Sequence, residues 1–188
     1  TPPGNEGINF DEEGVYWFTP SDFEEGSIQL DKAEKYVNNE TISLNAIKVY
    51  PKGSVLFVGI ASIGKIGFCS NYSYSNQQIT AIKPNGVMGG KYLAYSVLAS
   101  MDFIKSNALY TTVPIVNNSY LGIIKICLPN STEQTQIANY LDNHCSKIDS
   151  IIESKKEQLT KITQHKKSMI YEYVTGKKRV KGAISNGN

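Results

Sequence analysis

The sequence predicts an α+β protein in two parts: a mixed, mostly β globular domain over residues 1–130 and one long, coiled-coil-forming α-helix over residues 131–176. Short apolar runs broken by Gly, Pro, Asn and Ser fill the first part. Residues 131–175 contain neither Gly nor Pro, and their apolar side chains recur every three or four residues. That spacing is typical of a helix that packs on another helix. A basic tail over residues 177–188, which we expect to be flexible, follows the helix.

Runs of β-branched and aromatic residues locate strands in the first part. Residues 53–59 (GSVLFVG) and residues 123–129 (IIKICLP) have the composition and the flanking turn residues of strands. Between them, a helical periodicity of apolar side chains predicts a helix near residues 92–105. The first part is therefore predicted to be mostly β with one helical interruption.

Sequence signals mark both ends of the long helix. Ser131 and Gln134 have the spacing of a capping box, in which the Ser131 hydroxyl accepts from the backbone N–H of Gln134 and the Gln134 side chain reaches back. Gly176 is a natural helix stop. A helix between these signals would be roughly 65 Å long at ~1.5 Å per residue.

A heptad stripe runs along this helix with alternating spacings of four and three residues. Two of its ten positions, Lys155 and Lys166, are charged, and the others are apolar or aromatic. One alternative is that the helix folds back onto its own domain, but so long and narrow a stripe exceeds what one domain can cover. We predict that the stripe pairs with the helix of a second copy or with an equivalent helix. The heptad stripe consists of Leu141, Cys145, Ile148, Ile152, Lys155, Leu159, Ile162, Lys166, Met169 and Tyr173.

Composition excludes several classes of protein. The three cysteines form no CxxC pair and only two histidines could assist a metal, which disfavours a disulfide framework, a metal site and a cofactor in this chain. We expect a reducing, cytoplasmic location. No apolar run approaches the ~18 residues of a membrane span, so no membrane partner is predicted. No signal peptide opens the chain, and residues 1–4 (TPPG) resemble the middle of a loop, so the N-terminus of the domain is expected to be truncated.

Charge gives little support to nucleic-acid binding. Residues 1–130 hold 9 Lys against 11 Asp and Glu, a net charge of −2, whereas residues 131–188 hold 10 Lys and Arg against 6 Asp and Glu, a net charge of +4. A DNA-binding domain normally carries a basic footprint. Any prediction of DNA binding must therefore rest on other observations.

Residues 59–66 (GIASIGKI) match the GxxxxGK pattern of a phosphate-binding loop. A phosphate loop needs Ser or Thr after the lysine to hold Mg²⁺, and a helix to follow. Here Ile66 follows Lys65, and residues 67–69 resemble a strand. We therefore predict a glycine turn between two strands, with a nucleotide-binding loop as the alternative.

No catalytic arrangement stands out elsewhere. His144 and Cys145 are adjacent on the long helix, where neighbouring side chains point about 100° apart and do not form a joint site. No Ser/His/Asp or paired-carboxylate pattern is evident. The sequence therefore predicts a protein without an active site.

A polar and aromatic stretch, residues 72–78 (YSYSNQQ), is the best candidate surface for reading DNA. Asn and Gln side chains pair with the N6 and N7 edge of adenine, and Tyr and Lys contact phosphates. The alternative is a set of solvated or internally bonded turns, in which Asn76 and Gln77 bond neighbouring backbone. The candidate DNA-contacting residues are Thr19, Ser62, Lys65, Tyr74, Asn76, Gln77 and Lys91.

Several segments, in order along the chain, resemble the specificity subunits of type I restriction-modification systems. Residues 16–22 (YWFTPSD) are similar to a tryptophan-centred strand near the start of that family's target recognition domain. The junction with a spacer helix is the most specific segment, where ICLP is followed by EQTQIANYLD over residues 133–142. The other similar segments are residues 52–57, 62–65, 75–78, 147–149 and 174–177.

The resemblance implies a non-catalytic DNA sequence-specificity module, in which residues 1–130 would be a target recognition domain that reads one half of a bipartite target in double-stranded DNA. Residues 131–176 would be the spacer helix. A full subunit carries two of each, with its helices antiparallel, so this chain would be a fragment or a half-subunit that homodimerises. Methyltransferase (M) subunits, which use S-adenosylmethionine, and a restriction (R) subunit would be its partners. The alternative is a coiled-coil homodimerising scaffold with a protein-binding head.

Overall fold

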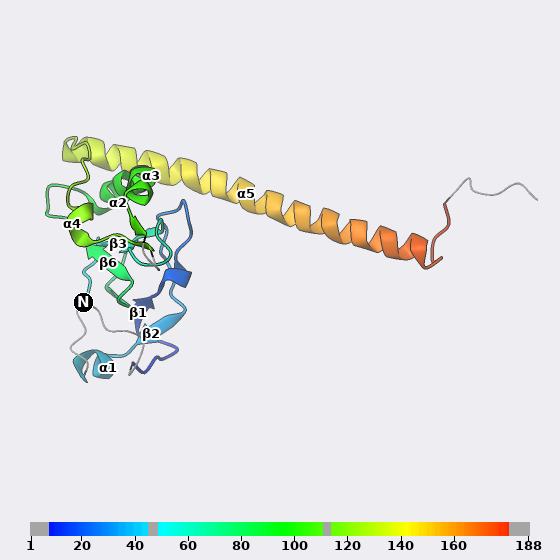
Figure 1. The fold of residues 1–188 in the computed structure, drawn as a ribbon, viewed down its shortest axis with the longest axis horizontal. Helices are drawn as coiled ribbons and strands as arrows, with labels where there is room; N and C mark the ends of the chain where they lie inside the picture. The colour runs from blue at the N-terminus through cyan, green and yellow to red at the C-terminus, as the bar shows by residue number, and fades with distance from the viewer. Residues whose placement is uncertain (1–7, 45–48, 111–113, 181–188) are drawn as a thin grey trace, which may run out of the picture. The chain divides into compact units, whose positions relative to one another are not determined.

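The computed structural model describes residues 8–44, 49–110 and 114–180 (Figure 1). The chain divides into two compact units, Thr1–Asn139 and Tyr140–Asn188. The division falls nine residues after the boundary expected from the sequence, because the first turns of the long helix belong to the globular unit.

In the described part of the globular unit, the β structure consists of two three-stranded sheets and a strand pair. In one sheet the order is β2-β1-β5, with β1 antiparallel to β2 and parallel to β5. In the other the order is β4-β3-β6, and both pairings are antiparallel. The strands are β1 (Val15–Phe18), β2 (Lys35–Val37), β3 (Val55–Val58), β4 (Ile66–Phe68), β5 (Ser73–Ser75), β6 (Ile79–Ile82), and the pair β7 (Leu109–Tyr110) and β8 (Pro114–Ile115).

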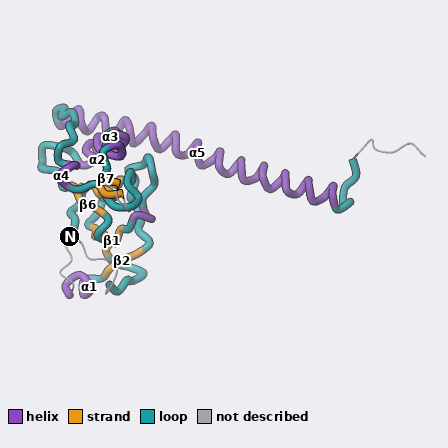
Figure 2. Tube along the Cα trace, viewed as in Figure 1, coloured by secondary structure: helices purple, strands orange, loops and turns teal. Residues whose placement is uncertain are grey.

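Short helices and long loops fill most of the remaining globular unit (Figure 2). Among the described residues, no helix has the length and the apolar character needed to cross a bilayer. The helices are η1 (Pro20–Asp22), α1 (Asn39–Leu44), α2 (Gly90–Ala99), α3 (Met101–Ser106), α4 (Asn118–Leu121) and α5 (Ser131–Val174). The mixed α+β architecture predicted from the sequence, with one long C-terminal helix, is confirmed.

Strand β3 lies at the centre of the core. All four of its residues are buried, with Val55 and Phe57 in one apolar cluster and Leu56 and Val58 in another. This division follows from the alternation of side chains along a strand. Full burial of each such side chain stabilises the fold by about 1.5–3 kcal/mol. A third cluster surrounds the fully buried Trp17 of β1.

The helix predicted near residues 92–105 is present but divided. It forms as α2 and α3, with Ser100 between them at φ −89° and ψ 5°. The Ser96 hydroxyl donates to the Tyr92 carbonyl and the Ser100 hydroxyl donates to the Ser96 carbonyl. Such back-bonding favours bending of a helix, which accounts for the break.

The strand predicted over residues 123–129 is wrong. This segment is irregular, although Ile124 and Ile126 do pack against the core cluster around β3. The alternation of apolar residues is therefore real, but no strand among the described residues pairs with this backbone. The Tyr92 hydroxyl instead donates to the Cys127 carbonyl at 3.0 Å.

The predicted capping box at the start of α5 is also wrong. The residue that caps the helix is Asn130, whose side-chain oxygen accepts from the backbone N–H of Glu133 at 3.0 Å. The Gln134 side chain does not reach back to Ser131, because it is 2% exposed and bonds three other backbone groups. The C-terminal stop is confirmed: Gly176 adopts φ +75° two residues after Val174, the last residue of the helix.

Candidate nucleic-acid interface

The GxxxxGK segment is the turn of a β-hairpin. It joins β3 to the antiparallel β4, and the Val58 N–H donates to the Lys65 carbonyl at 3.0 Å. A strand, and not a helix, follows Lys65, so the chain has no helix N-terminus here to aim at a phosphate. The predicted glycine turn is confirmed.

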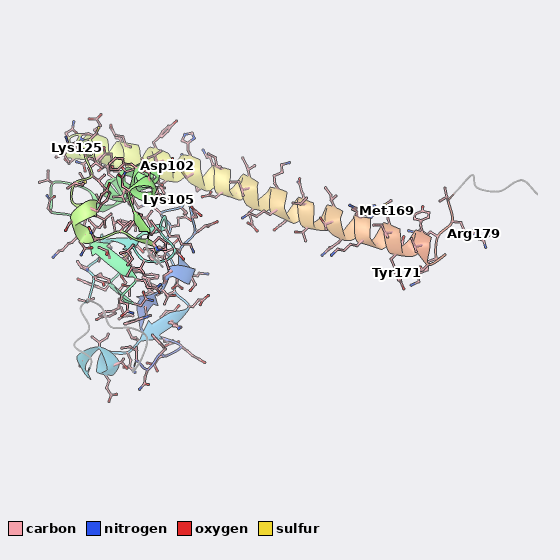
Figure 3. The ribbon with its side chains drawn as sticks, in the orientation of Figure 1. Asp102, Lys105, Lys125, Met169, Tyr171 and Arg179 are labelled. Carbon is pink, nitrogen blue, oxygen red and sulfur yellow. The ribbon has the colours of Figure 1, made fainter. Side chains whose placement is uncertain are left out.

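Hydrogen bonds to two other segments hold this turn in place, and an isolated β-bridge pairs Lys65 with Glu25 of a third. The Ala61 N–H donates to the Pro114 carbonyl at 3.0 Å, and the Lys65 ammonium donates to the Pro20 carbonyl at 2.9 Å. Lys105, labelled in Figure 3, pairs with Glu25 beside the turn. The hydrogen bond and the charge of Lys105 lower the pKa of the Glu25 carboxyl.

Glycine is required at one position of the turn. Gly64 adopts φ +116°, and a Cβ there would lie 2.2 Å from Cε of Lys105. At the exposed tip, Ala61 also adopts a positive φ, 66°. A positive φ is uncommon for a residue that carries a side chain, so Ala61 is a second position of the turn with a constrained backbone.

Three of the predicted DNA-contacting residues are buried. Thr19 is the N-cap of η1, and its hydroxyl and its N–H both donate to the Asp22 carboxylate. Asn76, 7% exposed, donates to the Gln78 side chain at 3.0 Å and accepts from the Gln78 N–H at 3.1 Å. Tyr74 lies in the cluster around Trp17, and this burial raises the pKa of its phenol.

The other four predicted residues are more accessible. Ser62, Gln77 and Lys91 are exposed, and Lys65 is half-buried. Ser62 lies at the tip of the hairpin turn, and Lys91 lies in the first turn of α2 with its ammonium 5.8 Å from the centre of the Phe68 ring.

Parallel pairing brings part of the predicted set to one sheet edge. Phe18 of β1 lies opposite Ser75 of β5, so Thr19 and Asn76 follow the same ends of adjacent strands. The Asn76 N–H donates to the Phe18 carbonyl at 3.2 Å, and Lys65 reaches the carbonyl of Pro20 next to Thr19. The hairpin turn, the loop after β1 and the loop after β5 therefore meet at one place.

Sequence reasoning missed the clamp formed by Glu25 and Lys105. The two residues are 80 positions apart, so no local motif links them. It also left Tyr72 out of the candidate set, although its side chain is largely exposed at the start of the polar stretch. An aromatic residue in a run of Ser, Asn and Gln was the available signal.

The described residues contain no group of three or more His, Cys, Asp or Glu side chains placed to hold a metal ion. Burial raises the pKa of the Cys69 thiol to about 11, and its sulfur lies 3.2 Å from the Ser73 hydroxyl. A thiol with so high a pKa is a poor nucleophile at neutral pH.

The heptad stripe on α5 is largely uncovered in the single chain. Ile148, Ile152, Leu159 and Ile162 are 55%, 45%, 66% and 64% exposed. Helices of soluble monomers rarely present a continuous row of such side chains to water. Figure 3 shows Met169, a stripe residue, on the opposite side of α5 from Tyr171.

A family model and curated relatives of this chain point to the same protein family. Residues 3–161 match the type I restriction modification DNA specificity domain. The chain is 28% identical over 147 residues to the MjaIX specificity subunit and 30% identical over 164 residues to the MjaVIII specificity subunit, both from Methanocaldococcus jannaschii. These alignments cover 77% and 87% of this chain, but 33% and 36% of the relatives. The chain therefore spans about a third of their length.

Solved structures share the fold. A chain from a structure of a type I R-M system superimposes with a TM-score of 0.67 at 18% identity, covering 90% of this chain and 40% of that one. The HsdS subunit from Thermoanaerobacter tengcongensis gives 0.64 at 17% identity, covering 91% of this chain and 40% of that one.

Proposed function

Because the chain belongs to the type I restriction modification DNA specificity domain family, we propose that its globular unit reads one half of a bipartite DNA target. The observation that carries the proposal is the hairpin turn after β3, which bonds the Pro114 and Pro20 carbonyls, pairs with Glu25 and presents Ser62 at its tip. A loop that is held in place before binding loses less conformational freedom when it docks, which favours affinity.

Direct base contacts would come from the exposed members of the candidate set. A Gln77 amide can pair with adenine N6 and N7, a Ser62 hydroxyl can bond several base edges, and Lys65 and Lys91 can approach phosphates. Thr19, Tyr74 and Asn76 would act indirectly, since their burial and internal bonds hold the loops from below. The net charge of −2 over residues 1–130 indicates that partner subunits would supply part of the phosphate contacts.

The chain itself would not be catalytic. Methyltransferase subunits, which hold the S-adenosylmethionine, and a restriction subunit would act at the place that this chain selects. The long helix would pair with the helix of a second copy or with an equivalent helix and so set the distance between two half-sites.

Methylome sequencing tests this proposal. Cells that express the chain with the methyltransferase encoded beside it should acquire adenine methylation at a two-part motif, and the motif should be palindromic if two copies act together. The variant Gln77→Ala should relax or change one motif position, whereas Gln29→Ala, at another exposed glutamine, should leave the motif intact. No new methylation from an intact complex would refute the proposal.

An apolar hollow in the globular unit supports the alternative function, a coiled-coil scaffold with a protein-binding head. It has a volume of about 380 Å³ beside β6, α2 and α4, and its lining includes Leu93, Val97, Leu121 and Ile124. Such a hollow can accept an apolar side chain of another protein. A protein-binding head would leave the methylome unchanged while Leu121→Glu, at a partly exposed position of the lining, abolished capture of the partner.

A further inference from the structure

Positive charge is concentrated at the C-terminal end of the chain. Residues 159–188 hold 7 Lys and Arg against 1 Asp or Glu, a net charge of +6, whereas residues 1–158 hold 12 against 16, a net charge of −4. The change of sign falls inside α5, so the first half of this helix is acidic and the second half is basic. A charge asymmetry of this kind is typical of contact with a polyanion.

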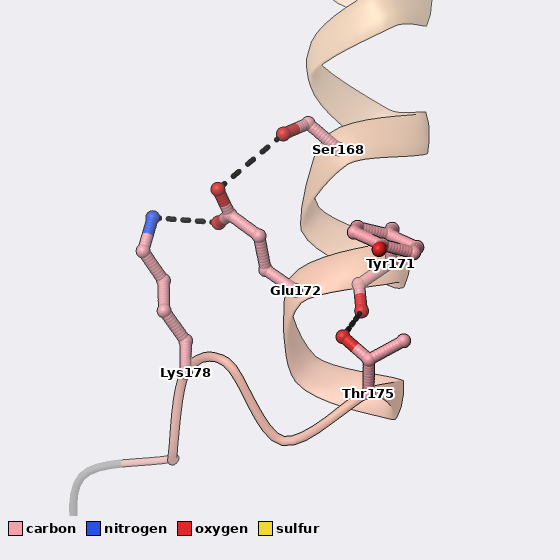
Figure 4. A network of polar contacts seen from close by, with 5 residues as sticks. All are labelled: Ser168, Tyr171, Glu172, Thr175 and Lys178. Carbon is pink, nitrogen blue, oxygen red and sulfur yellow. Dashed lines mark hydrogen bonds and ion pairs between the residues drawn. The ribbon is translucent and has the colours of Figure 1, made fainter.

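The closed end of α5 fixes where these cations lie. The Lys178 N–H donates to the Glu172 carbonyl at 2.9 Å, and the Lys178 ammonium pairs with the Glu172 carboxylate at 2.6 Å (Figure 4). In the same turn, the Thr175 hydroxyl donates to the Tyr171 carbonyl. Glu172 is the only acidic residue of residues 159–188, so its pairing leaves the charge of the other cations uncompensated.

A tyrosine lies among these cations. Lys167 and Tyr171 are four residues apart and are therefore neighbours on the helix surface. The Lys177 ammonium lies 4.6 Å from the centre of the Tyr171 ring. We define the basic end as Lys167, Tyr171, Lys177 and Arg179. All four residues are exposed, and in the described part of the chain none of the three cations pairs with a carboxylate.

The basic end does not coincide with the heptad stripe. None of its four residues belongs to the stripe, and Figure 3 shows Tyr171 on the opposite side of α5 from the stripe residue Met169. Pairing of the stripe with another helix would therefore leave Tyr171 and its neighbour Lys167 accessible.

We propose that the basic end binds the phosphate backbone of double-stranded DNA. Lysine, arginine and tyrosine side chains all donate to phosphate oxygens, and such contacts position a protein on the duplex without reading its sequence. The inference rests on the proposed function for its ligand, and it assigns a contact to a part of the chain outside the globular unit. A DNA-binding chain needs a basic footprint, which residues 1–158 do not supply.

The helix dipole accounts for only part of this charge. Cations near a helix C-terminus interact favourably with its last carbonyls, and the effect is confined to the last turn. Lys178 serves to close the helix end, since both its N–H and its ammonium bond Glu172. The Lys177 ammonium lies over an aromatic ring instead, and Lys167 lies seven residues before Val174, the last residue of α5. The dipole therefore does not explain these two cations, whereas a phosphate backbone does.

The salt dependence of DNA binding by the full chain tests the proposal. Affinity for a duplex of arbitrary sequence is measured by fluorescence anisotropy over a range of NaCl concentrations. Each phosphate contact contributes about 0.9 to the steepness of log K against log[salt], so the double variant Lys177→Gln, Arg179→Gln should lower the steepness by about 1.8. The charge-preserving variant Lys177→Arg, Arg179→Lys should keep the wild-type value.

The matched control is the double variant Lys147→Gln, Lys156→Gln. It removes the same charge from two exposed lysines in the acidic half of the same helix, so the steepness should not change. Equal steepness for the wild type and for Lys177→Gln, Arg179→Gln would overturn the proposal. So would a wild-type chain that does not bind duplex DNA at low salt. Loss of methyltransferase capture at an unchanged steepness would show that the basic end contacts a protein, and would overturn it as well.

Photo-cross-linking locates the contact. With the full chain bound to duplex DNA, Tyr171→p-benzoyl-phenylalanine should cross-link to the DNA. The same substitution at Tyr140, an exposed tyrosine in the acidic half of α5, should not. Absence of a cross-link from position 171 in a chain that binds the duplex would overturn the proposal.

The methylated motif separates this inference from the proposed function. Phosphate contacts carry no base preference, so Lys177→Gln, Arg179→Gln should leave the motif unchanged. Absence of any motif with the wild-type chain would refute DNA reading by the globular unit. A normal motif together with an unchanged salt dependence in the variant would refute only the contact at the basic end.

Discussion

Gln134 ties the first turns of α5 to the globular unit, and its replacement by leucine should destabilise that unit. Its side-chain oxygen accepts from the Gly89 N–H at 2.8 Å, and its nitrogen donates to the carbonyls of Val87 and Pro129 at 3.1 and 2.9 Å. All four residues belong to the unit Thr1–Asn139. The side chain is almost completely buried, so water does not replace these bonds readily.

The expected magnitude follows from the groups that Gln134→Leu leaves unpaired. A buried donor or acceptor that loses its partner costs about 1–3 kcal/mol, and the greater apolar surface of leucine offsets part of the loss. Since one N–H and two carbonyls are involved, and the carbonyls retain a second lone pair, we expect a loss of about 2–4 kcal/mol in the free energy of unfolding.

Urea unfolding monitored at Trp17, which is fully buried, measures this loss. The matched control is Gln136→Leu, an exposed glutamine in the same helical turn, for which we expect a change within about 0.5 kcal/mol. Equal stability of the two variants would show that the three bonds contribute nothing net, and the assignment of the first turns of α5 to the globular unit would lose its physical basis.

Two further predictions concern the hairpin turn and the end of α5. Gly64→Ala should lower the free energy of unfolding by about 1–3 kcal/mol, since φ of +116° disfavours a side chain and the new Cβ meets Lys105. Adding Lys105→Ala should recover only the part of this loss that comes from the clash with Lys105. Full recovery in urea unfolding would contradict a cost from the backbone conformation of residue 64. The Lys178 hydrogen bond and charge lower the pKa of Glu172, so the carboxylate stabilises the last turn above its ordinary pKa and this contribution disappears as the pH falls through the lowered value. The protection factors of the last-turn amides, which are the exchange rates corrected for their intrinsic pH dependence, should fall on acidification in the wild type and show no such pH step in Glu172→Gln. An identical profile of protection factors in both would refute the role of the pair.

Local signals in the sequence were sufficient for strand β3 and for the extent of α5. The run at residues 53–59 contains β3, and the absence of Gly and Pro before Gly176 delimits the long helix. These features depend on neighbours in the chain, where propensity and turn chemistry act. The same local reasoning failed at residues 123–129, because a strand also needs an edge to pair with, and the sequence does not show which edges are free.

Contacts between distant segments were beyond local reasoning. Ser131 and Gln134 satisfied the pattern of a capping box, yet the Gln134 amide bonds Val87 and Gly89, more than forty residues away. Asn76 matched the chemistry of a base-reading residue, but its position beside β5 supplies it with internal partners. For polar residues of this kind, sequence gives the chemistry and only the tertiary structure decides whether the group faces solvent.

The segment at residues 59–66 shows how one residue can decide between two structures. Its glycines and lysine match those of a phosphate loop, and both structures place a turn after a strand. Ile66, however, is 1% exposed and belongs to the core cluster with Val55 and Phe57, and it pairs with Phe57 across the hairpin. A buried β-branched residue directly after the lysine requires the chain to return along the sheet rather than begin a helix. Lys65 is thereby directed to the Pro20 carbonyl, where it holds the turn whose exposed tip carries Ser62.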